Sequence, residues 1–211
     1  MLLQNLFRAS DRKTIPLYSE EGSELLRSSR YRRNYQLLES KLRLDKQVWI
    51  SYCGVASTAV VLNAITNSSL YVQFKPFDFS KKQIISPIEA LCGMELKQLS
   101  QLFEEHEMNA RVFYARSINI EQFRDLAKQH LSRSNCFVIV NYLRKVLDQF
   151  GWGHISPLGA YNSDADSFLI LDVGQNCSPV WVKTNVLYEA TIAYDGLFNE
   201  SRGFVTVSQK Q

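Results

Sequence analysis

Three short segments contain the residue types that thiol-based acyl transfer needs: a cysteine, a histidine and an aspartate, in that order. Cys53 opens an apolar stretch, and His154 and Asp172 lie in later segments that read as β-strands. A thiol is a useful nucleophile only as the thiolate, which a helix N-terminus and a neighbouring imidazole both favour. The order and setting of these residues predict a nucleophile, a general base and an acid that orients the base.

Residues beside the cysteine add to this pattern. Gln47 precedes Cys53 by six positions, so its side-chain amide can join the Cys53 backbone N–H in an oxyanion hole. Gly54 follows directly and is expected to leave the first helical turn open to a substrate carbonyl. Asp172 lies in an apolar run, where a carboxylate is costly to bury unless it is paired, and pairing with His154 satisfies both side chains.

Each residue taken alone also has an ordinary structural explanation. Free cysteine is among the most buried residue types, so Cys53 could be an inert core thiol. His154 could be a hydrogen-bonded core histidine, and Arg202 could serve only to satisfy a loop. The combination of neighbours around Cys53, and not any single residue, favours the catalytic interpretation.

The elements that must position these residues follow from the pattern of apolar positions. A helix over 53–65, capped by Ser51, is apolar on nearly every face and is therefore predicted to be a buried central helix. Further helices are predicted at 21–41, 95–107, 121–131 and 184–193. Strands are predicted at 111–115, 136–140, 154–161, 168–173 and 203–207, after an irregular arm over 1–20. A helical first half before a strand-rich second half predicts an α+β fold, in a single domain over 1–211.

Composition excludes several classes of protein. The net charge of +3 is too small to argue for nucleic-acid binding. The four cysteines are far apart, which predicts neither a disulfide framework nor a metal site. No apolar run approaches the roughly 20 residues of a membrane span, and no clear signal peptide is present. We expect a soluble protein of a reducing compartment such as the cytoplasm, or one exported by a non-classical route.

Longer stretches of the sequence resemble a known family. The chain is similar to the phytochelatin synthases, in particular to their short bacterial members. The matching segments are 47–63, 137–145, 153–161, 168–173, 179–183 and 202–208. Weaker similarity begins near residue 16, so nearly the whole chain is covered.

The resemblance implies a papain-like fold, a reaction and a role for each site residue. The family removes glycine from glutathione through a γ-glutamylcysteinyl thioester, then passes the acyl group to water or to a second glutathione. Cys53 is then the nucleophile, His154 the general base and acid, Asp172 its orienter and Gln47 the oxyanion donor.

The same resemblance implies how the substrate is held. Asp195 and Arg202 match the positions that bind the α-amino and α-carboxylate groups of the γ-glutamyl moiety, and Gly54 and Gly153 border the site. A bidentate guanidinium suits a carboxylate, which agrees with an arginine at this position.

One position departs from the family pattern. Gln175 stands where the family usually has an arginine, and it cannot offer a charge to an acceptor's carboxylate. The alternatives are therefore a glutathione hydrolase, a papain-like peptidase for other γ-glutamyl peptides, and, from another class, a catalytically silent scaffold. No cofactor is expected to be required. The resemblance implies a role in heavy-metal detoxification, with cadmium or zinc ions as activators or as metal–glutathione thiolate substrates, and it leaves a homodimer open.

Overall fold

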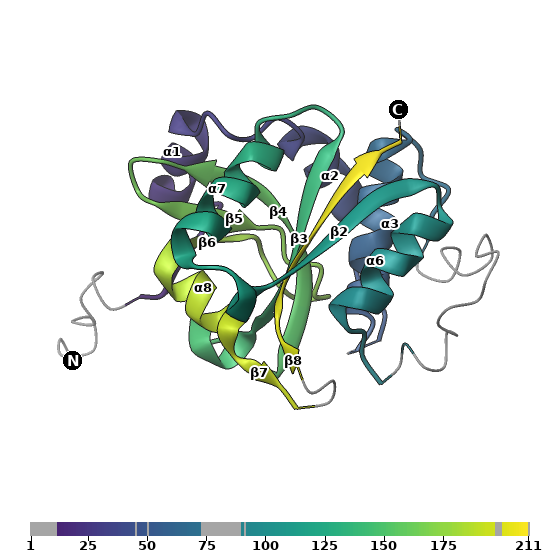
Figure 1. Ribbon diagram of the computed structural model, residues 1–211. Helices are drawn as coiled ribbons and strands as arrows, with labels where there is room; N and C mark the ends of the chain where they lie inside the picture. The colour runs from purple at the N-terminus through teal and green to yellow at the C-terminus, as the bar shows by residue number, and fades with distance from the viewer. Residues whose placement is uncertain are drawn as a thin grey trace, which may run out of the picture.

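An antiparallel β-sheet forms the centre of this computed structural model, which describes residues 12–44, 46–49, 51–72, 90, 92–196 and 200–210 (Figure 1). Within these residues seven strands pair in the order β1-β6-β5-β4-β3-β9-β2. They are β1 (Thr14–Pro16), β2 (Met108–Tyr114), β3 (Cys136–Leu143), β4 (Gly153–Asn162), β5 (Ser167–Ile170), β6 (Val180–Lys183) and β9 (Gly203–Gln209). A separate two-stranded ladder joins β7 (Tyr194–Asp195) to β8 (Glu200–Ser201).

Helices cover both faces of the sheet (Figure 1). They are α1 (Glu20–Ser28), α2 (Tyr35–Leu42), α3 (Cys53–Ile65), α6 (Leu96–Glu105), α7 (Ile120–Leu131) and α8 (Thr184–Ile192), with 3₁₀ turns η2 (Ala115–Ser117) and η3 (Arg144–Leu147). Side chains alternate along β3, so Phe137 and Ile139 join the core beneath α3 and α6, whereas Val138 and Val140 join the core beneath α7 and α8. The sheet is therefore a two-sided core element, which explains why its strands are apolar almost throughout.

The predicted α+β class is confirmed, and so is the buried central helix. Helix α3 begins at Cys53 and ends at Ile65, as predicted, and every one of its residues is buried. A buried helix that begins at a cysteine and packs against an antiparallel sheet is the arrangement expected of a papain-like fold. The predicted cap was wrong: Tyr52 is the N-cap residue, and it makes no side-chain capping bond. Helix α7 begins with a capping box formed by Asn119 and Gln122.

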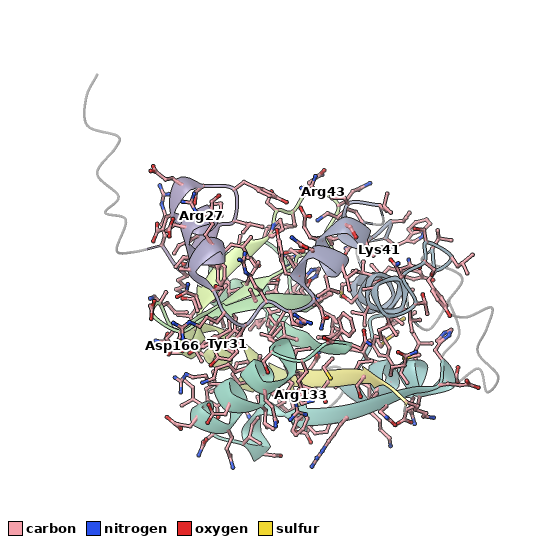
Figure 2. All side chains as sticks on the ribbon, turned by 90° about the horizontal axis from the view of Figure 1, so that it is seen from above. Arg27, Tyr31, Lys41, Arg43, Arg133 and Asp166 are labelled. Atoms are coloured by element: carbon pink, nitrogen blue, oxygen red, sulfur yellow. The ribbon has the colours of Figure 1, made fainter. Side chains whose placement is uncertain are left out.

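The polar segment 21–41 was predicted as one helix, and the structure shows two. Helix α1 ends at Ser28 and α2 begins at Tyr35. Between the two helices the backbone forms hydrogen bonds with other segments: Tyr161 N donates to Tyr31 O at 2.9 Å, and Arg33 N donates to Leu131 O at 3.0 Å. In Figure 2 Tyr31 lies below Arg27 of α1, away from Lys41 of α2.

The predicted irregular arm over 1–20 is partly wrong. Thr14–Pro16 forms strand β1, which pairs with β6 at one edge of the sheet. Pro16 is tolerated there because an edge strand leaves one side of its backbone unpaired. Helix α1 then starts at Glu20, and residues 1–11 lie outside the described part of the chain. No helix of the described residues combines the length and the apolar character that crossing a bilayer requires.

Candidate active site

The structure brings Cys53, His154 and Asp172 together from three separate elements. Cys53 begins α3, His154 is the second residue of β4, and Asp172 follows the end of β5. His154 Nε2 lies 2.8 Å from Asp172 Oδ1, and the other side of the ring is hydrogen-bonded to the Cys53 thiol. The three residues are only 7%, 3% and 1% exposed, so their interactions are shielded from water.

Burial and pairing act in opposite directions on the thiol and the imidazole. Burial would raise the pKa of Cys53, but the hydrogen bond and charge of His154 and the backbone N–H groups of Ile155 and Gly54 outweigh it, so the pKa is lowered. Burial would lower the pKa of His154, but its bonds to Asp172 and Cys53 raise it. These two directions favour a thiolate–imidazolium pair, the reactive form of a cysteine nucleophile.

Besides His154, three other groups donate hydrogen bonds to the Asp172 carboxylate. Burial would raise its pKa, but the hydrogen bond and charge of His154, the charge of Arg144 and the Gly174 N–H hold the pKa well below the usual range. Arg144 Nη2 donates to a carboxylate oxygen at 2.9 Å, Gly174 N donates at 2.8 Å and the Tyr142 hydroxyl donates at 3.4 Å. Asp172 is therefore fixed as an ionised acceptor. It was predicted on a strand over 168–173, but β5 ends at Ile170.

Sequence reasoning missed Arg144 and Tyr142. Arg144 opens η3 directly after β3, is almost fully buried, and also donates to Gln149 Oε1 at 3.1 Å. The Tyr142 ring lies edge-on to the His154 ring, with 5.7 Å between centroids. The sequence does contain a signal: Arg144 and Asp172 are opposite charges that each follow an apolar strand, and buried charges need a partner.

Gln47 lies beside the segment that contains the acid. Its backbone N donates to Val173 O at 2.9 Å, and its side chain is buried. The preceding Lys46 donates from Nζ to Asp172 O at 2.6 Å and to Cys177 O at 3.0 Å. These bonds attach the chain that leads into α3 to the chain that follows β5, so the predicted oxyanion donor and the acid belong to one hydrogen-bonded unit.

Gly54 is packed differently from the expectation. A side chain here would place Cβ 3.1 Å from Met94 Sδ and 3.4 Å from Ile155 Cδ1. The space that the sequence suggested would be open to a substrate carbonyl is therefore filled by Met94. The glycine instead allows Met94 to lie against the first turn of α3.

Asp195 and Arg202 also come together, and they pair with each other. Arg202 Nη2 lies 3.3 Å from Asp195 Oδ2, while Nη1 donates to Ala193 O at 3.2 Å and to Tyr194 O at 2.7 Å. Gly153 lies against the guanidinium, because a Cβ at this position would be 3.0 Å from Arg202 Nη2. The pair thus lies against Gly153, the residue before His154, and the bonds from Arg202 to the loop carbonyls agree with the structural alternative that the sequence left open.

A small cavity adjoins this ion pair. Three carboxylates contribute to its lining; the residues are Glu95, Leu96, Tyr114, Asn141, Asp195, Glu200 and Ser201. Among the described residues, no group of three or more His, Cys, Asp or Glu side chains is arranged to hold a metal ion.

The residue that stands where the phytochelatin synthases usually have an arginine faces solvent. Gln175 is exposed, in the loop between β5 and β6. Cys177 in the same loop is half-buried, and its Sγ lies 3.7 Å from Arg144 Nη2. All four cysteines are free thiols.

Comparisons with known proteins agree on one family. The family model described as phytochelatin synthase matches residues 8–204. The chain is 33% identical over 165 residues to glutathione gamma-glutamylcysteinyltransferase 1 of Arabidopsis thaliana, a match that covers 75% of this chain and 34% of that protein. It is 23% identical over 161 residues to glutathione gamma-glutamylcysteinyltransferase of Schizosaccharomyces pombe, covering 74% of this chain and 39% of that protein. The chain thus spans little more than a third of the length of these relatives.

Among solved structures, the peptidase domain of Streptococcus ComA, a bi-functional ABC transporter involved in a quorum sensing pathway, is similar with a TM-score of 0.49 and 15% identity. That match covers 79% of this chain and 97% of the ComA domain.

Proposed function

This chain belongs to the phytochelatin synthase family, and we propose that it cleaves glycine from glutathione through a thioester on Cys53. The observation that carries the proposal is the hydrogen-bonded series from Cys53 through His154 to Asp172, with a thiol whose pKa is lowered. The Cys53 thiolate attacks the cysteinyl carbonyl of glutathione. His154 gives its proton to the leaving amine of glycine, and the γ-glutamylcysteinyl group stays on sulfur.

The second half of the reaction regenerates the thiol. His154 takes a proton from water, or from the α-amine of a second glutathione, as that nucleophile attacks the thioester carbonyl. The carbon–sulfur bond breaks and Cys53 leaves as thiolate. Asp172 keeps the imidazole oriented through both halves, and its low pKa supports this role because it stays ionised. Gln47 is proposed to stabilise the oxyanion with its side-chain amide.

We propose that water is the favoured acceptor. Gln175 is exposed and uncharged where the family has an arginine, so an acceptor's carboxylate loses one charged hydrogen bond. A bond of this kind contributes about 1.5–3 kcal/mol, which corresponds to roughly a tenfold to hundredfold preference. Heavy-metal thiolates of glutathione are a second class of acceptor, since the metal binds the thiol and changes the charge and shape of the incoming molecule while its α-amine remains the nucleophile.

One experiment tests the reaction and its outcome together. Purified protein is incubated with glutathione, with and without cadmium, and glycine, γ-glutamylcysteine and the oligomeric product are measured. We expect glycine release with γ-glutamylcysteine in excess over oligomer, and a γ-glutamylcysteinyl adduct on Cys53 in mass spectra of the denatured protein.

Two variants complete this test. Cys53→Ala should abolish glycine release and the adduct, whereas Cys136→Ala, at a half-buried free thiol of β3, should retain both. An adduct on Cys92, Cys136 or Cys177 would assign the nucleophile elsewhere. Oligomer in excess over γ-glutamylcysteine without metal would refute the preference for water.

A further inference from the structure

Strand β5 is shorter than β4, so the backbone of Ile155 lies beyond the end of the neighbouring strand. At this end the register pairs Leu158 with Ile170, and Leu171 N then donates to Pro157 O at 2.9 Å. Hydrogen-bonded pairs alternate along an antiparallel ladder, so Ile155 is the next residue of β4 whose N–H and C=O point to this side. These two backbone groups therefore need partners other than a strand.

The pairing of β4 with β3 gives the same direction for Ile155. Arg144 N donates to Trp152 O at 3.0 Å, which makes these two residues a hydrogen-bonded pair. Asn141 and Ile155 are opposite each other three positions along the ladder, where the alternation requires a pair without hydrogen bonds. The N–H and C=O of Ile155 thus point away from β3.

The first turn of α3 supplies a partner for each of these groups. Cys53 and Ser57 are four residues apart, so they lie on the same face of the helix. The Ile155 N–H donates to the Cys53 sulfur. Ser57 Oγ donates to Ile155 O at 3.0 Å. Two side chains one helical turn apart therefore hold the two backbone groups of a single strand residue, the one that follows His154.

The bond from Ser57 differs from that of its neighbour in the same helix. Ser57 and Thr58 are both fully buried, and a buried hydroxyl is costly unless it is hydrogen-bonded. Thr58 Oγ1 donates to Gly54 O, within α3, at 2.9 Å. A bond of that kind would satisfy Ser57 as well, without any contact to β4. The bond that Ser57 makes instead fixes α3 against the strand that carries His154.

We propose that Ser57 is a positioning residue that holds the start of β4 against α3, so that the His154 ring and the Ile155 N–H both reach the Cys53 sulfur. It acts through the backbone of Ile155 and not on the sulfur itself. The inference deepens the proposed function, because a sulfur with both donors in place is favoured as the thiolate. Without the Ser57 hydroxyl, β4 is free to move from the helix and the protonated thiol gains.

Alkylation of Cys53 tests the inference without turnover. Iodoacetamide reacts with the thiolate, so its rate of reaction at the Cys53 peptide, followed by mass spectrometry against pH, reports the thiolate fraction. Ser57→Ala should slow alkylation at pH 6 by about tenfold and move the midpoint of the profile to higher pH. The value of kcat/KM for glycine release should fall by a similar factor. His154 and Tyr142, two titratable groups whose charges act on Cys53, are unchanged in this variant.

Ser29→Ala is the matched control, because it removes another buried hydroxyl that donates to a backbone carbonyl. Ser29 is the C-cap residue of α1, and its Oγ donates to Leu25 O at 2.6 Å. The same carbonyl accepts a bond from Asn162, at the far end of β4 from His154. Both variants should lower the melting temperature by about 2–4 °C. Ser29→Ala should keep the alkylation profile of the unmodified protein.

Three results would overturn the role of Ser57. The first is an unchanged alkylation profile in Ser57→Ala, and the second is an equal change in both variants. The third is a Ser57→Ala protein that unfolds, or melts far below Ser29→Ala, which would show that the hydroxyl secures the core and not the thiol. Absence of glycine release by the unmodified protein would refute the proposed reaction, and the alkylation profiles would still decide the role of Ser57.

Discussion

At the scale of single residues, the site depends on how Asp172 is held. The carboxylate accepts hydrogen bonds from the His154 ring, the Arg144 guanidinium and the Gly174 backbone. An acid with this many donors cannot take the proton of the imidazole, so it orients the ring and stabilises its charge. The same carboxylate compensates the buried charge of Arg144, so in the proposed reaction one residue serves both the chemistry and the stability of the fold.

Asp172→Asn should therefore lose activity and stability together. The amide removes the charge opposite His154 and Arg144 and turns an N–H₂ group toward one of these donors. We expect kcat for glycine release to fall by about 10³- to 10⁴-fold. The free energy of unfolding should fall by about 3–5 kcal/mol, because Arg144 remains buried without its partner. Steady-state kinetics and urea denaturation measure the two effects.

A second paired acid, which is half-exposed, provides the comparison for this variant. Asp166 receives a bidentate pair from Arg124, at 2.9 and 3.0 Å, in the turn between β4 and β5. Asp166→Asn should lower stability and leave kcat unchanged. If Asp172→Asn turned over glutathione at the unmodified rate, Asp172 would be a structural acid only.

At the scale of elements, the site is assembled where strands begin and end. His154 is near the start of β4, Arg144 follows β3, and Asp172 follows β5. Arg202 directly precedes β9, and the first residue of β4, Gly153, lies against its guanidinium. Strand ends suit this purpose because side chains there leave the packed core and yet keep the positions that the ladder imposes.

Gly153→Ala tests the contact between β4 and Arg202. The new Cβ would lie 3.0–3.2 Å from the guanidinium, which two backbone carbonyls hold in place. We expect Arg202 to shift and KM for glutathione to rise by about tenfold, with little change in kcat, because the triad is not touched.

Gly196→Ala is the matched control, since it follows β7 and a Cβ there meets no atom of the described residues within 4 Å. Its KM should match that of the unmodified protein. An unchanged KM in Gly153→Ala, or equal increases in both variants, would contradict the role of this contact.

The sequence predicted the elements that have a clear pattern of apolar residues. It missed those that depend on backbone pairing with strands far along the chain. Helix α3 was predicted to the residue, because thirteen consecutive buried positions leave little ambiguity. The break between α1 and α2 was missed, because the backbone of Tyr31 bonds to β4, which lies far along the chain. Strand β1 was missed for the same reason, since three residues become a strand only beside β6.

The predictions for the site residues divide in a similar way. Cys53, His154 and Asp172 could be found from residue type, order and setting, and the structure brings them together. Tyr142 could not be found in this way, because its place beside His154 arises from the register of β3 and β4, and Arg144 had only the weaker signal of an opposite charge that follows an apolar strand. Gly54 shows the reverse limit, because its position was foreseen but its packing against Met94 was not, whereas the bonds of Arg202 to loop carbonyls match an alternative that the sequence offered.

At the scale of the whole molecule, two buried or half-buried acids lie beyond opposite ends of β5. Asp166 precedes the strand and Asp172 follows it. Partial burial would raise the pKa of Asp166, but hydrogen bonds from Arg124, Thr184 and Tyr161 outweigh it and lower the pKa to about 2. The pKa of Asp172 is also well below its usual range. Both ends of this strand therefore depend on an ionised carboxylate.

This arrangement predicts that the molecule loses stability in acid. A carboxyl group whose pKa is lower in the folded than in the unfolded state contributes stability above its unfolded pKa of about 4. That contribution disappears as the pH falls toward the folded pKa, which for Asp166 is about 2. Urea denaturation should give a nearly constant contribution from these acids at pH 5–7 and a steep loss of unfolding free energy between about pH 4 and pH 2.5.

Two variants in the β4–β5 turn distinguish the contribution of Asp166 to acid unfolding from that of the other carboxyl groups. Asp166→Asn should lower the unfolding free energy at pH 7 and make its loss between pH 4 and pH 2.5 shallower, because one of the two linked protons is no longer taken up. Asp164→Asn, at an exposed acid two residues earlier, should reproduce the unmodified curve. A pH-independent unfolding free energy in this range would refute the linkage. So would an Asp166→Asn curve parallel to that of the unmodified protein, because the proton taken up in acid would then belong to another group.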